Sequence, residues 1–313
     1  MPFRAFGADL VLTRGADGAA ALFDAHCPHL GTHLGHGGRM VGNLLECPFH
    51  GWRFDRKGQC VGVPLAGAIP PNARLRPWHV REVNGVVLAW YNPAGGDPIW
   101  EIPEIAERRS PGWSQFYPGK RWVIRTHPQE IVENGIDCAH FPHNHSGQTA
   151  GVESLGLEIN GPTLTHRVIQ HHNIFGIGAR LGWRVKGTLD ITAHGLGCVV
   201  NRIRIRESVS FDYCVVFYIL PIDAERVALH SYYAMRRKGV LTLPLIWHAM
   251  RGVTCTIDQD VPIWENKLYR ERPRLSRADG PIMQFRRWAR QFYVMDDAMA
   301  PEATAALAAT DGN

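Results

Sequence analysis

Residues 27–50 read CPHLGTHLGHGGRMVGNLLECPFH, and this stretch pairs a thiol with an imidazole twice. Cys27 is followed by His29, and Cys47 is followed by His50, with 17 residues between the two pairs. Thiolates and neutral imidazoles are common ligands of transition metals. The stretch therefore predicts a metal site built from two loops, and the surrounding region must fold so that both loops reach it.

Two kinds of metal site can use two thiolates and two imidazoles. A single zinc ion accepts this set, but zinc sites more often use C-x2-C pairs or place both histidines together. In a Rieske [2Fe–2S] centre two cysteines hold one iron and two histidines hold the other, so each loop supplies one of each. The spacing favours the Rieske cluster, and glycines at 31, 35 and 51 allow tight loops.

The composition indicates a soluble globular protein with room for two domains. The chain has 313 residues, of which 45% are hydrophobic and 20% are charged. Its net charge of +5 comes from interspersed residues of both signs, which does not indicate a nucleic-acid partner. The longest apolar runs, at 213–220 and 240–247, are shorter than the roughly 20 residues of a membrane span. We expect core elements there and no transmembrane segment.

The start of the chain and its cysteines indicate the cytoplasm. The first residues, MPFRAFGADLVLTR, show no basic region followed by an apolar stretch and a cleavage site. The seven cysteines are an odd number scattered along the chain, unlike a secreted disulfide framework.

The first hundred residues read as short β segments separated by glycine and proline. Asn84-Gly85 joins two alternating runs and predicts a type I′ hairpin. The proline-containing stretch 92–105 reads as a linker. We therefore expect an all-β domain at 1–102 and a second domain at 103–313.

The second part predicts an antiparallel sheet covered by helices. Its pattern indicates strands at 121–127, 163–174, 181–193, 198–206, 211–220 and 226–236. Helices are expected from Gln129 to about Ala139, near 260–271 and near 283–294. Together the two parts make an α+β protein whose second domain is of the helix-grip type.

A second metal motif, ENGIDCAHFPHNH, lies at 133–145. Asp137 and His140 are three residues apart, so on a helix the carboxylate can orient the imidazole. Pro142 should end that helix and let His145 return to the same metal. Two histidines and one carboxylate make the facial triad of non-heme iron oxygenases, which leaves positions open for O2 and substrate.

The third ligand is expected from TIDQDVPIWENK at 256–267. Both Asp258 and Asp260 are available, and either one can instead cap a helix. A Rieske electron carrier is the alternative from another functional class, but a carrier ends near residue 100. The two hundred further residues and their histidine motif favour an enzyme.

These motifs resemble a known family. CPHLGTHL and CPFHGWRFD are similar to the Rieske domain of bacterial ring-hydroxylating oxygenases, and N-x-x-D-x-x-H-x4-H resembles the mononuclear iron motif of the same enzymes. DVPIWENK and DGPIMQFRRWARQFY look most like 3-ketosteroid 9α-hydroxylases and Neverland-type cholesterol 7-desaturases. The resemblance implies that His140, His145 and Asp260 hold the iron.

The resemblance also implies a reaction. A terminal oxygenase receives electrons from an NAD(P)H-fed flavin and iron–sulfur reductase or a ferredoxin, and uses O2 to hydroxylate or desaturate a steroid-like substrate. A smaller aromatic or heterocyclic substrate is the alternative within the family. Its working unit is expected to be a head-to-tail homotrimer. In that ring Asp137 would link His140 to His50, or to His29, of the neighbouring subunit.

Overall fold

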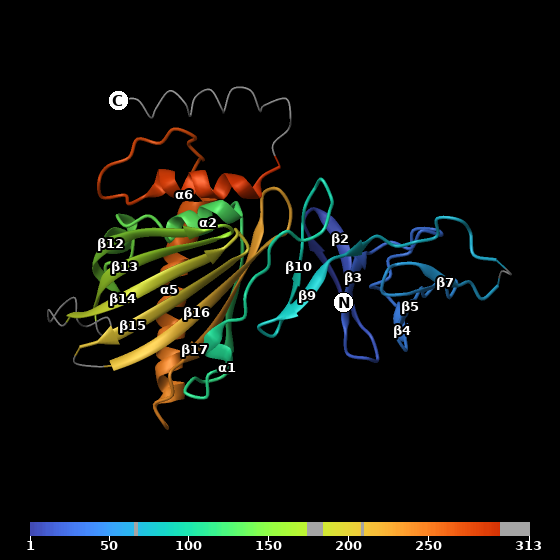
Figure 1. Cartoon of the computed structure of the whole chain (residues 1–313), viewed down its shortest axis with the longest axis horizontal. Coiled ribbons are helices and arrows are strands. Elements are labelled where there is room, and N and C mark those ends of the chain that lie inside the picture. Colours follow the sequence, from blue (N-terminus) through green and yellow to red (C-terminus); the bar gives the residue numbers. More distant parts are fainter. Residues whose placement is uncertain (66–67, 174–183, 208–209, 295–313) are drawn as a thin grey trace.

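The structure is a computed structural model that describes residues 1–65, 68–173, 184–207 and 210–294. Figure 1 shows two regions side by side, a smaller all-β region at the N-terminal end and a larger region of sheet and helices. The predicted α+β organisation is confirmed.

The smaller region contains two four-stranded antiparallel sheets and a hairpin. The first sheet, in the order β1-β2-β3-β8, comprises Pro2–Ala5, Ala8–Arg14, Ala20–Asp24 and Pro77–Trp78. The second, in the order β4-β5-β6-β7, comprises Arg39–Val41, Leu44–Glu46, Arg53–Phe54 and Cys60–Gly62. Side chains from both sheets share one core, and Cys27 and Cys47 are buried in it.

The hairpin at Asn84-Gly85 is confirmed. β9 (Val80–Val83) pairs with β10 (Val86–Ala89), and Val83 lies opposite Val86. The φ angles are 56° at Asn84 and 79° at Gly85, and a type I′ turn needs positive values at both positions. Asparagine and glycine reach these values at low cost, so two residues set the register of the hairpin.

A seven-stranded antiparallel sheet forms the larger region, in the order β11-β17-β16-β15-β14-β13-β12. In chain order from β11 to β17 the strands are Tyr117–Ile124, Thr149–Asn160, Thr163–Asn173, Arg184–His194, Cys198–Arg206, Ser210–Pro221 and Val227–Met235. Each strand except β12 is predicted from the sequence. Residues 174 and 181–183 of those predictions lie outside the described residues.

The segment between the two regions is fixed to the outer face of the large sheet. Ile105 belongs to a buried cluster on that face. The next residues form α1 (Ala106–Arg109), whose Glu107 pairs with Arg202 of β15 at 2.6 Å. The predicted linker at 92–105 therefore ends in an anchored segment.

Helices cover the inner face of the sheet, where the main core lies (Figure 1). They are α2 (Pro128–Asn134), α3 (His140–Asn144), α5 (Thr242–Asn266) and α6 (Ile282–Ala289), followed by η2 (Arg290–Phe292). The prediction of one helix over 129–139 is wrong, because α2 ends at Asn134 and α3 begins at His140. Pro142 lies inside α3, where the first amides have no intrahelical acceptor and proline is tolerated.

α5 begins at Thr242 and not near residue 260. The expectation that the apolar run 240–247 lies in the core holds for only part of it: Ile246 belongs to the main core, whereas Val240 is 92% exposed and Trp247 is 70% exposed. By length and composition alone, Gly239–Asn266 is the one helix of the described residues that is apolar enough to cross a membrane. In this structure it lies along the sheet (Figure 1).

A buried ion pair holds α6 against α2. Arg286 donates from Nε and Nη2 to both carboxylate oxygens of Glu133, each at 2.7 Å. Both side chains are buried. Removing one partner of such a pair leaves the other charge uncompensated in the interior.

We predict that Arg286→Ala lowers the free energy of unfolding by roughly 3–5 kcal/mol, as measured by urea denaturation. The adjacent Arg287 is exposed. Its replacement by alanine should change the free energy of unfolding by less than about 0.5 kcal/mol. Equal losses in the two variants would contradict a structural role for the ion pair.

Candidate metal centres

The two cysteine loops of the smaller region have the same backbone geometry. Each cysteine amide donates to the carbonyl five residues later, and the amide four residues later donates to the cysteine carbonyl, at 2.8–3.0 Å. That fourth residue is glycine in both loops, with φ of 75° at Gly31 and 69° at Gly51. A side chain is disfavoured at such angles, so the glycines let both loops turn tightly around their cysteine.

The loops bring four metal donors together. The thiols of Cys27 and Cys47 interact, and burial raises the pKa of Cys27 to about 11. The rings of His29 and His50 lie 4.7 Å apart, and Nδ1 of His50 is buried without a hydrogen-bond partner among the described residues. A buried thiol ionises readily only beside positive charge. Paired thiols, paired imidazoles and an unsatisfied ring nitrogen fit a [2Fe–2S] cluster.

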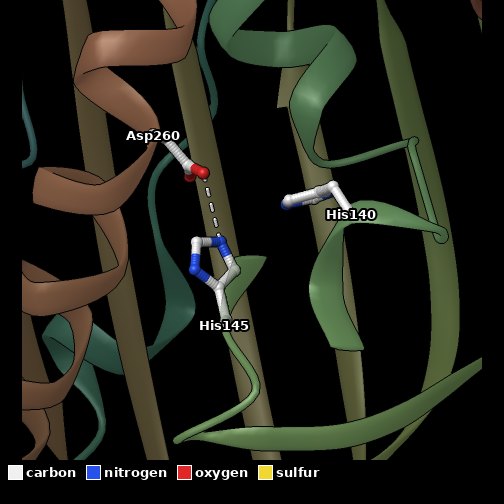
Figure 2. Close-up of side chains that lie close together, drawn as sticks. All are labelled: His140, His145 and Asp260. Carbon is white, nitrogen blue, oxygen red and sulfur yellow. Dashed lines mark ion pairs between the residues drawn. The ribbon is translucent and has the colours of Figure 1, made fainter. Parts of the chain in front are cut away.

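A second group of donors lies on the inner side of the large sheet (Figure 2). His140 begins α3, His145 directly follows it, and Asp260 comes from α5. One donor atom from each lies within 4.8 Å of those from the other two. Nε2 of His145 is 3.3 Å from Oδ1 of Asp260, and both side chains are buried. Two imidazoles and one carboxylate at these distances fit a mononuclear non-heme iron.

Hydrogen bonds orient both imidazoles toward the centre. Nδ1 of His140 donates to the Asp137 carbonyl at 2.7 Å, and Nδ1 of His145 donates to Oε1 of Gln259 at 2.8 Å. These partners place a proton on Nδ1 in each ring, so Nε2, which faces Asp260 in His145 and Asn134 in His140, is the nitrogen that would bind a metal. Burial lowers the pKa of His140, which favours its neutral form.

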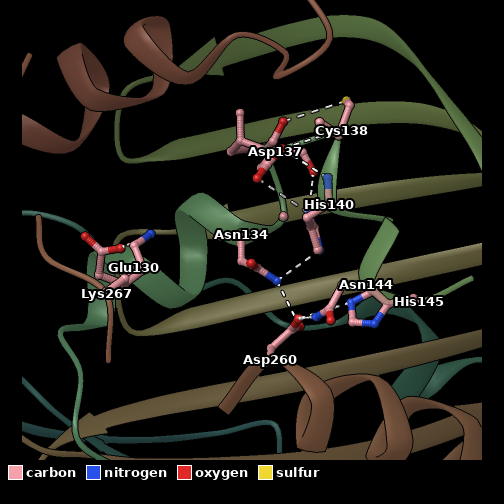
Figure 3. Close-up of polar contacts among 12 residues, drawn as sticks. Glu130, Asn134, Asp137, Cys138, His140, Asn144, His145, Asp260 and Lys267 are labelled. Atoms are coloured by element: carbon pink, nitrogen blue, oxygen red, sulfur yellow. Dashed lines mark hydrogen bonds and ion pairs between the residues drawn. The ribbon is translucent and has the colours of Figure 1, made fainter. Parts of the chain in front are cut away.

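Two asparagines hold the buried carboxylate (Figure 3). Asn134 donates to Oδ2 of Asp260 at 3.0 Å and lies 3.2 Å from Nε2 of His140, while Asn144 donates to Oδ1 at 2.6 Å. The motifs give no role to Asn144 or Gln259. Asparagine and glutamine occur in many environments. The one signal in the sequence is that Asn144 directly precedes His145 and Gln259 directly precedes Asp260.

The Asp137 carboxylate does not orient His140 as the sequence suggests. Its Oδ1 accepts from the amides of Ala139 and His140, at 2.9 and 3.4 Å, and so closes the turn that leads into α3. Its Oδ2 is 3.9 Å from Nδ1 of His140, whose hydrogen bond goes to the Asp137 carbonyl. The helix break after Asn134 explains the difference, because Asp137 and His140 do not share one helix.

Asp258 and Asp260 have different surroundings. Asp258 accepts from Nζ of Lys120 at 2.6 Å and from Nε1 of Trp122 at 2.7 Å. The hydrogen bond from Lys120 lowers the pKa of Asp258, although burial opposes the shift. The structure thus brings Asp260, and not Asp258, to the two histidines.

An apolar cavity of about 530 Å³ adjoins the three donors. It lies between α5 and the inner face of the sheet, and its walls include Val185, Leu189, Ile203, Phe217, Leu229 and Trp264. Asn201 Oδ1 and His172 Nε2 are buried in the walls without a hydrogen-bond partner among the described residues. Such a cavity suits an apolar molecule that carries few polar groups.

Family models match most of the chain. A Rieske [2Fe–2S] domain matches residues 1–75, and the 3-ketosteroid 9α-hydroxylase C-terminal domain matches residues 89–293. The first match contains all four donors of the cysteine loops, and the second contains His140, His145 and Asp260.

Curated relatives match both regions together. A probable 3-ketosteroid-9-alpha-monooxygenase oxygenase component of Rhodococcus rhodochrous is 32% identical over 308 residues, covering 95% of this chain and 76% of the relative. A cholesterol 7-desaturase of Ciona intestinalis is 30% identical over 332 residues, covering 99% and 67%.

Solved structures share the fold. Dicamba monooxygenase bound to dicamba has a TM-score of 0.75 at 19% identity, covering 93% of this chain and 91% of the other. NdmB of Pseudomonas putida CBB5 has a TM-score of 0.76 at 19% identity, covering 92% and 83%. On these matches, the chain belongs to the 3-ketosteroid 9α-hydroxylase family of Rieske oxygenases, O2-dependent oxidoreductases that use a [2Fe–2S] cluster and a mononuclear iron.

Proposed function

We propose that this oxygenase hydroxylates or desaturates a steroid or sterol-like substrate. The observation that carries the proposal is the apolar cavity that reaches His140, His145 and Asp260. Its few unpartnered polar atoms suit a large hydrocarbon skeleton with one or two oxygen substituents. The relatives named for steroid and cholesterol oxidation support the same substrate class.

His140, His145 and Asp260 are the proposed ligands of the mononuclear iron, and Cys27, His29, Cys47 and His50 those of the cluster. The bound iron supplies activation of O2 with electrons delivered through the cluster. The protein contributes the positions of the groups: Asn134 and Asn144 hold the Asp260 carboxylate, and Gln259 fixes the ring of His145. The apolar walls exclude water and position a substrate carbon beside the iron.

We propose a homotrimer in which the cluster of one subunit serves the iron of the next. Asp137 lies at the proposed contact, where its backbone carbonyl holds His140 and its carboxylate would reach His50, or His29, of the neighbouring subunit. The 35% exposure of the Asp137 side chain and its attachment to His140 through the backbone carbonyl support this role. An external NAD(P)H-fed reductase or ferredoxin would supply the electrons.

We also propose a boundary between the two domains and a cellular compartment for the protein. We place the Rieske domain at 1–102 and the catalytic domain at 103–313, because Ile105 already packs on the catalytic sheet. None of the seven cysteines, all of which the structure describes, forms a disulfide, which supports a reducing compartment such as the cytoplasm.

The substrate class is tested by turnover with a matching reductase, NADH and O2. A 3-ketosteroid or cholesterol should gain the mass of one oxygen atom, or lose two hydrogen atoms, in mass spectrometry. Hydroxylation under ¹⁸O2 should label the product. Conversion of small aromatics such as benzoates, with every steroid left unchanged, would refute the steroid proposal.

The iron ligands are tested by comparing two aspartates on one helix. Asp260→Ala should lose the mononuclear iron and roughly a hundredfold or more in turnover, yet keep the visible spectrum of the cluster. Asp258→Ala should retain the cluster and the mononuclear iron, because its partners are Lys120 and Trp122. Iron and acid-labile sulfide analysis provides the measurement. Exchanged results, or zinc without sulfide, would show that the ligand assignment is wrong.

Asp137→Asn removes the negative charge of Asp137 but keeps a side-chain oxygen that can accept hydrogen bonds in the turn before α3. The amide oxygen can still accept from Ala139 and His140, so both metal sites should remain. Reduction of the cluster should be normal, whereas electron transfer to the mononuclear iron in single-turnover experiments should slow at least tenfold. Sedimentation should show a trimer. A fully active monomer, or normal transfer in the variant, would exclude the inter-subunit path.

A further inference from the structure

Apolar side chains are exposed around the N-terminal end of α5. Val240 is 92%, Leu241 58%, Leu243 50% and Trp247 70% exposed. Leu243 and Trp247 are four residues apart on the helix, so they lie next to each other on one face. Figure 1 shows this end of α5 extending past the sheet on the side away from α6. Clustered exposure of large apolar side chains marks a surface that binds a protein, a membrane or a ligand.

The cavity reaches the surface at the same place. Most residues that line it are buried or partly buried, and the exposed ones are Ser210, Lys238, Leu241 and His248. Three of these belong to the end of α5 or the turn before it, and Ser210 begins β16. Leu243 and Trp247 are not among the lining residues. One helix end therefore presents one face to the cavity mouth and another face outward.

The charged side chains within this segment are all basic. Residues 236–251 read RRKGVLTLPLIWHAMR, with four basic side chains and no aspartate or glutamate. Arg236 lies 3.8 Å from Asp212, and Arg237 donates to the Trp113 carbonyl at 2.8 Å. Lys238 and Arg251 are exposed. Basic residues beside exposed leucine and tryptophan are typical of segments that lie in the interface of an anionic bilayer.

We propose that residues 236–251 dock on the surface of an anionic lipid bilayer. Val240, Leu243 and Trp247 would enter the boundary between headgroups and acyl chains, while the basic side chains contact lipid phosphates. The cavity mouth would then face the acyl region, so an apolar substrate could pass from lipid into the cavity. That route rests on the proposed function, whereas the docking itself does not.

A second copy of the chain related by a two-fold axis fits this surface less well. A two-fold contact places the basic residues of one copy against the same residues of the other. It would also cover Lys238, Leu241 and His248, where the cavity reaches the surface. A bilayer offers both the negative charge and the apolar phase, and it is also where apolar molecules accumulate.

The test is co-sedimentation of the holoenzyme with vesicles. It should bind phosphatidylglycerol–phosphatidylcholine vesicles, bind pure phosphatidylcholine vesicles far more weakly, and dissociate as salt is raised. Trp247→Asp should weaken binding at least tenfold, and Arg251→Gln about fivefold, the contribution of one basic residue near an anionic surface. Ile99→Asp is the matched control, since Ile99 is 85% exposed but distant in the chain from α5; it should bind as the unmodified protein does.

Turnover measured with two ways of supplying the steroid distinguishes membrane docking from the oxidation reaction. With steroid delivered in cyclodextrin, Trp247→Asp should match the unmodified enzyme, because Trp247 does not line the cavity. With steroid dissolved in anionic vesicles, the variant should be slower. The docking proposal would be overturned if the protein did not bind vesicles, or if Ile99→Asp lost as much vesicle binding as Trp247→Asp. A changed oligomeric state in Trp247→Asp would overturn it as well. Vesicle binding that behaves as expected without steroid oxidation would refute only the proposed function and the substrate route.

Discussion

The burial of the Asp260 carboxylate is the constraint on which the catalytic region depends. A carboxylate in the interior is unfavourable unless hydrogen bonds and positive charge compensate it. Asn134 at the end of α2 and Asn144 in α3 donate to its two oxygens, and His145 lies 3.3 Å away. One side chain of α5 therefore fixes the positions of α2 and α3, and a bound metal would complete the compensation.

The sequence points to the proposed metal donors more clearly than to the groups that support them. Cysteine and histidine at short spacing have few alternative uses, so both cysteine–histidine pairs and the pair His140 and His145 stand out from the sequence, whereas only the family resemblance favours Asp260 over Asp258. Gln259 and Asn144 act through contacts with residues that the fold brings near, and no local pattern distinguishes them. For Asp137 the sequence suggests a contact that the structure does not show. An unbroken helix would bring its carboxylate to the His140 ring, whereas the structure has its backbone carbonyl accept from Nδ1 of His140.

The missed strand β12 and the misplaced start of α5 each have a local cause. β12 is an edge strand whose two register shifts break the alternation of apolar and polar residues. The first turns of α5 resemble a core segment because the run 240–247 is apolar, and eight residues are too few to reveal a helical period. Hydrophobicity predicts burial on average, but an apolar segment can also be exposed for contact with another phase.

α5 combines three environments along one rigid element. One face of its first turns is exposed, its middle lines the cavity, and Asp260 near its end meets the histidines. From Leu241 to Asp260 the helix rises about 28 Å, at roughly 1.5 Å for each residue. The cavity mouth and the metal donors are thus held at a fixed separation by backbone hydrogen bonds. Each residue turns the helix by about 100°, so a one-residue insertion between them would rotate Asp260 away from His145. The apolar mouth and the buried carboxylate therefore depend on the same helical register.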